Sequence, residues 1–136
     1  MSEYETQAQA FLDANGLRFR ATCKNSHCPT WCDGKHIHGD CYRVTISRKG
    51  GGRLSFDFWN SKHDKLNHQT PTPYNALACL SSEAYCPDTF EDFCSELGYE
   101  ADSRKALATF RTWDKFATRI RAFFTEDELD ALGDIQ

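Results

Sequence analysis

Residues 23–41 contain a dense group of side chains that could bind a metal ion. Four of the seven cysteines and three of the five histidines of the chain fall in this segment: Cys23, His27, Cys28, Cys32, His36, His38 and Cys41. Zinc in proteins is usually bound by four Cys or His side chains in a tetrahedron. A polar segment with few apolar residues also gains from such an ion the ordering energy that a core would otherwise supply. The composition and spacing therefore predict a structural zinc site.

The pattern favours some of these ligands over others. Cys23 continues the apolar alternation of Leu17 and Phe19, so it is either a core thiol or a reserve ligand. His27 is a second reserve ligand. The preferred ligands are Cys28, Cys32, Cys41 and one of His36 and His38.

Two other states of these cysteines stay open at this point. They could be reduced thiols without a metal ion, or they could form disulfide bonds. Disulfides are the weaker alternative, because the acidic and polar N-terminus carries no export signal and the number of cysteines is odd. The other three cysteines fall in helical patterns and are interpreted as small buried residues: Cys79, Cys86 and Cys94.

A catalytic zinc ion needs an open coordination position and a nearby general base, commonly Glu. Residues 23–41 offer only Asp33 and Asp40 as carboxylates, and the chain has no HExxH motif. A non-enzymatic protein is therefore expected, and a metal-dependent enzyme is the weaker alternative.

The elements that must position this segment are a helix and three strands. Residues 3–15 show a helical apolar pattern, and residues 17–23, 42–48 and 54–59 alternate apolar with polar side chains. Gly50 to Gly52 supply the residues of a hairpin turn between the last two strands. The sequence predicts a three-stranded antiparallel sheet with a Cys/His metal loop, residues 23–41, between its first two strands.

The rest of the chain, residues 72–135, is predicted to be helical. Capping residues precede the apolar stripes at four places: Thr72, Asp88 or Thr89, Asp102-Ser103, and Thr125. At 136 residues with 40% hydrophobic side chains, the chain has the size of a single domain, residues 1–136. The expected fold class is α+β, with helices packed on the sheet. No apolar run is long enough to span a bilayer, so no membrane partner is expected.

The net charge of −4 hides a strong segregation. Residues 17–53 contain eight basic and two acidic residues, whereas residues 83–102 contain seven acidic residues and no basic one. The acidic stretch predicts a partner-binding surface at Glu91, Asp92 and Glu96, which could compete for a basic nucleic-acid channel. The alternation of the strands places Arg18, Arg20 and Arg43 on the polar face of the sheet. Nucleic-acid binding through these arginines is the alternative.

Two segments carry a resemblance to a known family: TFEDFCSELGY at residues 89–99 and DSRKA at residues 102–106. With them, residues 42–135 resemble a family of small, largely uncharacterised proteins encoded by bacteriophages and prophages. The resemblance implies a phage accessory protein that acts in the cytoplasm of the bacterial host. Small acidic phage proteins often block host machinery, so it also implies a host-defence inhibitor of the anti-CRISPR type.

The sequence thus predicts a non-enzymatic, zinc-containing protein that binds and inhibits a host protein or ribonucleoprotein. The first alternative is a zinc-stabilised nucleic-acid-binding module, and the second is a metal-dependent enzyme.

Overall fold

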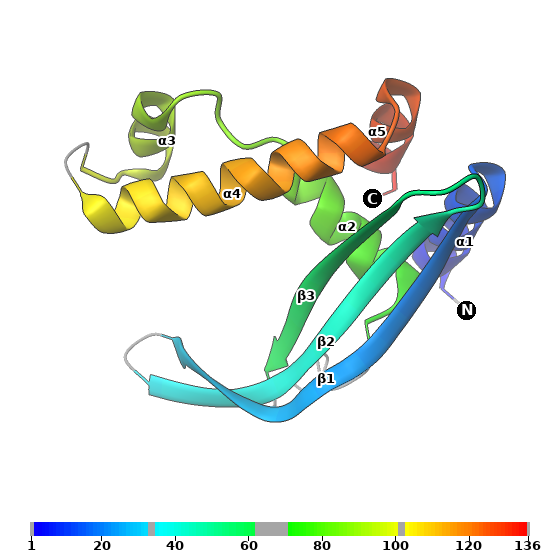
Figure 1. Cartoon of the computed structure of the whole chain (residues 1–136), viewed down its shortest axis with the longest axis horizontal. Helices are drawn as coiled ribbons and strands as arrows, with labels where there is room; N and C mark the ends of the chain where they lie inside the picture. The colour runs from blue at the N-terminus through cyan, green and yellow to red at the C-terminus, as the bar shows by residue number, and fades with distance from the viewer. Residues whose placement is uncertain (1, 33–34, 62–70, 101–102, 136) are drawn as a thin grey trace. The chain divides into compact units, whose positions relative to one another are not determined.

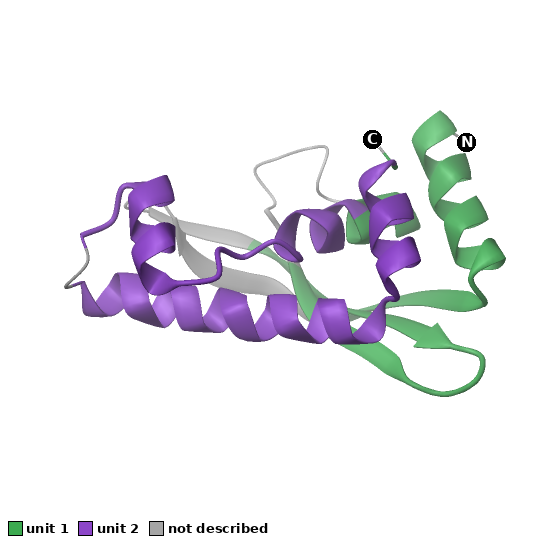
Figure 2. Cartoon of the chain, turned by 90° about the horizontal axis from the view of Figure 1, so that it is seen from above, with its two compact units in different colours: residues 1–77, 135 green, residues 78–134, 136 purple. Residues whose placement is uncertain are grey.

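The computed structural model describes residues 2–32, 35–61, 71–100 and 103–135, and for residues 25–32, 35–38 and 59–61 it describes the backbone alone. The chain divides into two compact units, residues 1–77 with 135 and residues 78–134 with 136 (Figure 2). Along the chain the elements are α1 (Glu3–Ala14), β1 (Leu17–Cys32), β2 (Lys35–Arg48), β3 (Arg53–Ser61), α2 (Pro73–Glu83), α3 (Phe90–Leu97), α4 (Arg104–Phe123) and α5 (Glu126–Gly133).

The first unit contains the predicted three-stranded antiparallel sheet, with β2 between β1 and β3 (Figure 1). The register pairs Ala21 with Val44 and Val44 with Phe56, so the apolar positions of the three strands share one face. Most of this face is buried, including Leu17, Val44, Ile46, Leu54 and Phe56. The predicted α+β class and the sheet are confirmed.

The helices of the first unit are tied together by the carboxylate of Glu5 in α1. The Thr72 hydroxyl donates a hydrogen bond to this carboxylate, and the Tyr74 backbone N–H donates to it at 3.3 Å. Tyr4 packs on the Tyr74 ring, with 5.2 Å between the ring centroids. The first N–H groups of a helix have no partner within the helix, so Glu5 supplies one from a segment distant in sequence. The contact fixes the start of α2 against α1.

The chain does not form a loop over residues 23–41. β1 continues to Cys32 and β2 begins at Lys35, and the register pairs these two residues directly. Only Asp33 and Gly34, which lie outside the described residues, connect the strands. Asp-Gly is a strong sequence signal for a two-residue hairpin connection, and it is the physical reason why the expected loop is replaced by paired strands. The predicted loop is therefore wrong as secondary structure, and the segment is the outer part of a long β-hairpin.

The second unit is helical, and its capping residues act as the sequence predicts. Thr89 accepts a hydrogen bond from the Asp92 N–H at 3.1 Å, and Ser103 accepts one from the Ala106 N–H at 3.2 Å. Thr125 and Glu128 form a complete capping box at the start of α5. These caps satisfy N–H groups that would otherwise have no partner, which is why each helix begins where it does.

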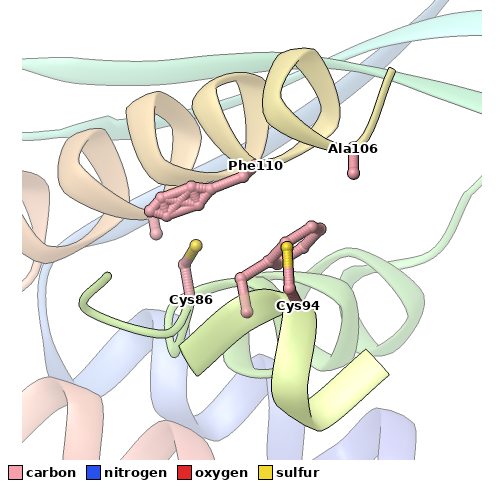
Figure 3. Packing of buried hydrophobic residues seen from close by; sticks show 6 residues of the cluster. Cys86, Cys94, Ala106 and Phe110 are labelled. Atoms are coloured by element: carbon pink, nitrogen blue, oxygen red, sulfur yellow. The ribbon is translucent and has the colours of Figure 1, made fainter. Parts of the chain in front are cut away.

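Phe93 is the centre of the apolar cluster of the second unit. Its side chain is fully buried, and its ring makes edge contacts with Phe110 and Trp113 at centroid distances of 5.3 and 6.0 Å. Cys86 and Cys94 point toward α4 in the same cluster (Figure 3). The Trp113 indole N–H donates to the Glu83 carbonyl oxygen at 3.0 Å, which ties α4 to the end of α2. The rings of Phe90 and Phe93 thus link α3 to α4.

None of the described helices is long and apolar enough to cross a membrane. The expectation of one domain over residues 1–136 stays a prediction, since two compact units can belong to one folding domain.

Replacing Phe93 with Ala removes this ring from the cluster. We expect the free energy of unfolding to fall by about 3–5 kcal/mol, because the change loses buried apolar area and leaves a cavity. Urea unfolding followed by tryptophan fluorescence measures the loss. Leu97→Ala on the same helix is the matched control, and because Leu97 is 52% exposed it should change the stability by less than about 0.5 kcal/mol. Equal effects of the two substitutions would contradict the assignment of Phe93 to the core.

Candidate functional site

The backbone brings the predicted metal ligands to the outer part of the β1–β2 hairpin. The register pairs Cys28 with Gly39 and Cys32 with Lys35, so Cys28 and Cys32 in β1 run beside residues 35–39 of β2. His36 and His38 occupy that part of β2, with Trp31 and Pro29 as their Cα partners. The side chains of Cys28, Cys32, His36 and His38 lie outside the described residues, so their ligand roles stay a prediction.

Among the residues that the structure describes, none forms a third strand beside this part of the hairpin. β3 pairs with β2 only from Gly39 to Ser47, so residues 28–32 and 35–38 form a two-stranded ribbon beyond the sheet. Two register shifts in β1, between Cys23 and Asn25 and between Asn25 and Cys28, separate the ribbon from the regular ladder. A two-stranded hairpin alone is at best marginally stable in water. The ribbon therefore needs a further source of order.

The side chains of Cys23 and Cys41 are described; Cys23 is exposed and Cys41 is half-buried. The register places Cys23 opposite Tyr42, on the apolar side of the sheet, but Cys23 is exposed. Its interpretation as a core thiol is therefore wrong. Among the side chains that the structure describes, no group of three or more His, Cys, Asp or Glu residues could hold a metal ion. Cys41 is one of these described side chains, whereas Cys28, Cys32, His36 and His38 are not.

Two of the three cysteines of the second unit are buried, as the sequence predicts, and Cys79 is half-buried. Cys86 and Cys94 are buried, and the Cys94 thiol donates a weak hydrogen bond to the Glu100 carbonyl oxygen at 3.8 Å. Burial, with a smaller contribution from Glu83, raises the pKa of the Cys79 thiol to about 11. Burial also raises the pKa of Cys86. Because the thiolate is the reactive form, these cysteines are poor nucleophiles at neutral pH.

The predicted partner-binding residues lie together on α3. Glu91, Asp92 and Glu96 are all exposed, and none of them makes an ion pair with a residue that the structure describes. Glu91 and Asp92 occupy the first turn of the helix, where negative side chains interact favourably with the helix dipole. The carboxylates therefore form an exposed acidic surface that is compatible with a stable helix.

Exposed apolar side chains flank this acidic surface. Leu97 is predicted from the helical pattern to point inward, but it is 52% exposed, and Tyr99 is 45% exposed. The Tyr99 ring nevertheless stacks on Phe93, with a centroid distance of 5.4 Å and an angle of 7° between the ring planes. Gly98 ends the helix with a φ of 75°, which turns the chain between these two residues. The sequence pattern identifies the apolar face of a helix, but it does not show which residues of that face a neighbouring element buries. The exposure of Leu97 was therefore not predicted.

The three arginines of the alternative hypothesis lie on one exposed sheet face. The register pairs Arg18 with Ser47, Arg20 with Thr45 and Arg43 with Thr22. These positions alternate with the buried apolar ones, and all three arginines are exposed. The prediction that they share the polar face is confirmed.

Asp57 in β3 pairs with two cations on this face. Its carboxylate lies 3.0 Å from the Lys24 Nζ and 2.8 Å from the Arg43 Nε. The hydrogen bond from Lys24, and then that from Arg43, lowers the pKa of Asp57. The pKa of Asp57 is lower in the folded protein than in the unfolded chain. The ion pairs of Asp57 therefore stabilise the fold fully at pH values above the unfolded-state pKa, and this stabilisation is lost as the pH falls through the folded-state pKa. All three side chains are about half exposed, so the contribution to stability is small.

No protein-family model, curated protein or solved structure matches the chain. The functional interpretation therefore depends on the residues and their geometry.

The burial of Cys79 predicts its reaction with iodoacetamide. We expect Cys79 to react far more slowly than the exposed Cys23 at pH 7.5, and its rate to rise steeply as the pH approaches 11, because its thiolate forms only there. Alkylation at several pH values, followed by peptide mass spectrometry, measures both rates in one sample. Similar rates for Cys79 and Cys23 at pH 7.5 would contradict the buried environment of Cys79.

Proposed function

We propose that the chain is a non-enzymatic binding protein that captures and inhibits a host protein or ribonucleoprotein through the surface of α3. One observation supports this most directly. Of the four large hydrophobic side chains that are exposed in the described part of the chain, two lie at the C-terminal end of α3, Leu97 and Tyr99, and a third, Tyr85, follows α2 in the same unit. Tyrosine is enriched at protein interfaces, and exposed apolar side chains within a polar rim are typical of binding surfaces.

The charge of the second unit supports a basic partner. Residues 78–136 contain thirteen acidic and six basic residues, which gives this unit a net charge of −7. Glu91, Asp92 and Glu96 carry part of that charge beside the exposed apolar side chains. A negative surface accelerates association with a positive one and disfavours nucleic acid as a ligand. A basic protein surface that binds nucleic acid has the positive charge that this acidic surface would attract.

The resemblance of residues 42–135 to phage-encoded proteins supports a host target. On this proposal the chain acts in the cytoplasm of the infected bacterium as a host-defence inhibitor of the anti-CRISPR type. The acidic surface would then occupy the basic channel in which the target holds its nucleic acid.

We also propose that zinc orders the outer hairpin through Cys28, Cys32, Cys41 and one of His36 and His38. The support is the density of Cys and His residues in this segment of the sequence, together with the finding that no described residue forms a third strand beside residues 28–32 and 35–38. A metal ion that crosslinks the two strands would supply the order that pairing alone does not. Its role would be structural, and no chemical step is assigned to it.

Substitution of the acidic surface tests the proposed capture. We expect the triple variant Glu91→Gln, Asp92→Asn and Glu96→Gln to lose at least 90% of the host protein that the wild-type chain retains. The lysate of the bacterium that carries the gene is treated with nuclease, and the captured protein is quantified by mass spectrometry. Charge complementarity is the physical reason, since the substitutions remove three negative charges and keep the side-chain size.

The matched control is the variant Glu126→Gln, Asp127→Asn and Asp130→Asn in α5. These three residues are also exposed, and two of them lie in the first turn of their helix, as Glu91 and Asp92 do in α3. The control therefore removes the same charge and a similar helix-dipole interaction. Equal capture by both variants and the wild type would refute the α3 surface.

Zinc content is the test of the proposed metal site. We expect protein purified in reducing buffer to contain about one zinc ion per chain, the stoichiometry of one four-ligand site. The double variant Cys28→Ser and Cys32→Ser should contain less than about a tenth of that, because two ligands are lost. Elemental analysis by mass spectrometry measures both values. Cys79→Ala, a cysteine in the other unit, is the control and should keep the wild-type zinc content. A wild-type chain without metal would refute the site.

A further inference from the structure

The polar face of the sheet carries an excess of positive charge, and the function proposed for the acidic surface of α3 does not use it. Across the three strands the register aligns Arg18 with Ser47 and Ser47 with Arg53, and one step further Arg20 with Thr45 and Thr45 with Ser55. Arg43 and Asp57 form the third row. The exposed cations of this face are Arg18, Arg20, Lys24, Arg43 and Arg53. We call this set the arginine face.

The spacing of the arginine face makes the like charges interact. Neighbouring strands lie about 4.8 Å apart and alternate residues along a strand about 6.7 Å apart. Arg18 and Arg53, separated by two strand spacings, are therefore within roughly one Debye length of each other at physiological salt. The repulsion among the cations is relieved when a polyanion binds them.

The positions between the arginines are small and hydroxylated. Thr45 and Ser55 are half-buried and share a hydrogen bond of 3.0 Å. Ser47 is also half-buried, and Thr22 is exposed. Beside these short side chains, the longer arginine side chains are exposed. Arginine recognises phosphate with two parallel hydrogen bonds, and hydroxyl groups can donate further ones.

The single carboxylate of this face neutralises only part of its charge. Asp57 forms ion pairs with both Lys24 and Arg43. The five cations and this carboxylate leave a net charge of +4 on the arginine face. A phosphate group that approaches Arg43 must compete with Asp57 for the same guanidinium group.

We propose that the arginine face binds the sugar–phosphate backbone of a nucleic acid, independently of base sequence, and that Asp57 limits the affinity by competing for Lys24 and Arg43. The surface lies wholly in the first unit, so the inference is independent of the partner proposed for α3. Nucleic acid is the occupant that matches a row of cations, because its phosphates present regularly spaced negative charges.

Binding of a fluorescein-labelled 20-nucleotide oligo(dT) and of a 20-base-pair duplex, measured by anisotropy between 50 and 200 mM salt, tests the proposal. The wild-type chain should bind at least one of the two probes, with an affinity that falls steeply as salt rises. Arg18→Ala with Arg20→Ala should weaken binding about tenfold and reduce the salt slope by about 1.4 to 1.8, as expected when two phosphate contacts are lost. A wild-type chain that binds neither probe at 50 mM salt would overturn the proposal.

Asp57→Asn is the decisive variant because its effect has the opposite sign. It should tighten binding about two- to fivefold, which corresponds to the free energy of an exposed ion pair. A folding defect cannot produce tighter binding, so this variant keeps the test valid even if the arginine variants lose stability. Unchanged or weaker binding by Asp57→Asn would refute the competition.

Arg111→Ala with Lys115→Ala in α4 is the charge-matched control. Both residues are exposed, and they belong to the second unit. This variant removes the same charge as the Arg18 and Arg20 variant, and we expect it to change the affinity less than twofold. An equal loss of binding by the two variants would assign the effect to net charge rather than to the arginine face. Competition by polyglutamate as strong as that by oligo(dT) would likewise exclude recognition of the phosphate backbone.

Discussion

The antiparallel register around β2 is the constraint on which the surfaces of the first unit depend. Because side chains alternate along a strand, pairing Val44 with both Ala21 and Phe56 gathers the apolar positions on one face. The same pairing must then gather Arg18, Arg20 and Arg43 on the other. A slip of one residue in any strand would expose apolar side chains and bury arginines, so burial of the apolar face fixes the position of the charges as well. The strand register thus determines both the packing of the apolar face and the position of the charged residues on the other face.

The two units divide the charge of the chain, which the acidic net value conceals. Residues 1–77 contain ten basic and seven acidic residues, a net charge of +3, whereas residues 78–136 have a net charge of −7. A pI near 5.7 would argue against nucleic-acid binding if the charge were spread evenly. The sign of the charge therefore differs between the two units, and the net value of the whole chain describes neither of them.

Local signals were readable from the sequence, and signals that depend on distant partners were not. Thr89 and Thr125 cap their helices as predicted, because a cap requires only a side chain and an N–H group three residues away. The hairpin over residues 23–41 differs from the predicted loop, because the Cys and His pattern carries no signal for the strand pairing that joins the two segments. The exposure of Leu97 could not be predicted, since a helical stripe does not reveal how far the neighbouring helix extends. The hydrogen bond between Glu5 and Tyr74 joins residues that are far apart in the sequence, so no local sequence pattern predicts it.

The outer hairpin and the arginine face depend on different sources of order, although they share β1 and β2. Three-stranded pairing, a buried apolar face and the contact of α1 with β1 stabilise the inner sheet, where Arg18, Arg20 and Arg43 lie. No described residue forms a third strand beside residues 28–32 and 35–38, and two register shifts separate this ribbon from the inner ladder. Such shifts interrupt the pairing locally, so disorder in the ribbon need not spread to the sheet. A zinc ion would therefore act on the shape of the ribbon, while the charge of the arginine face would persist without it.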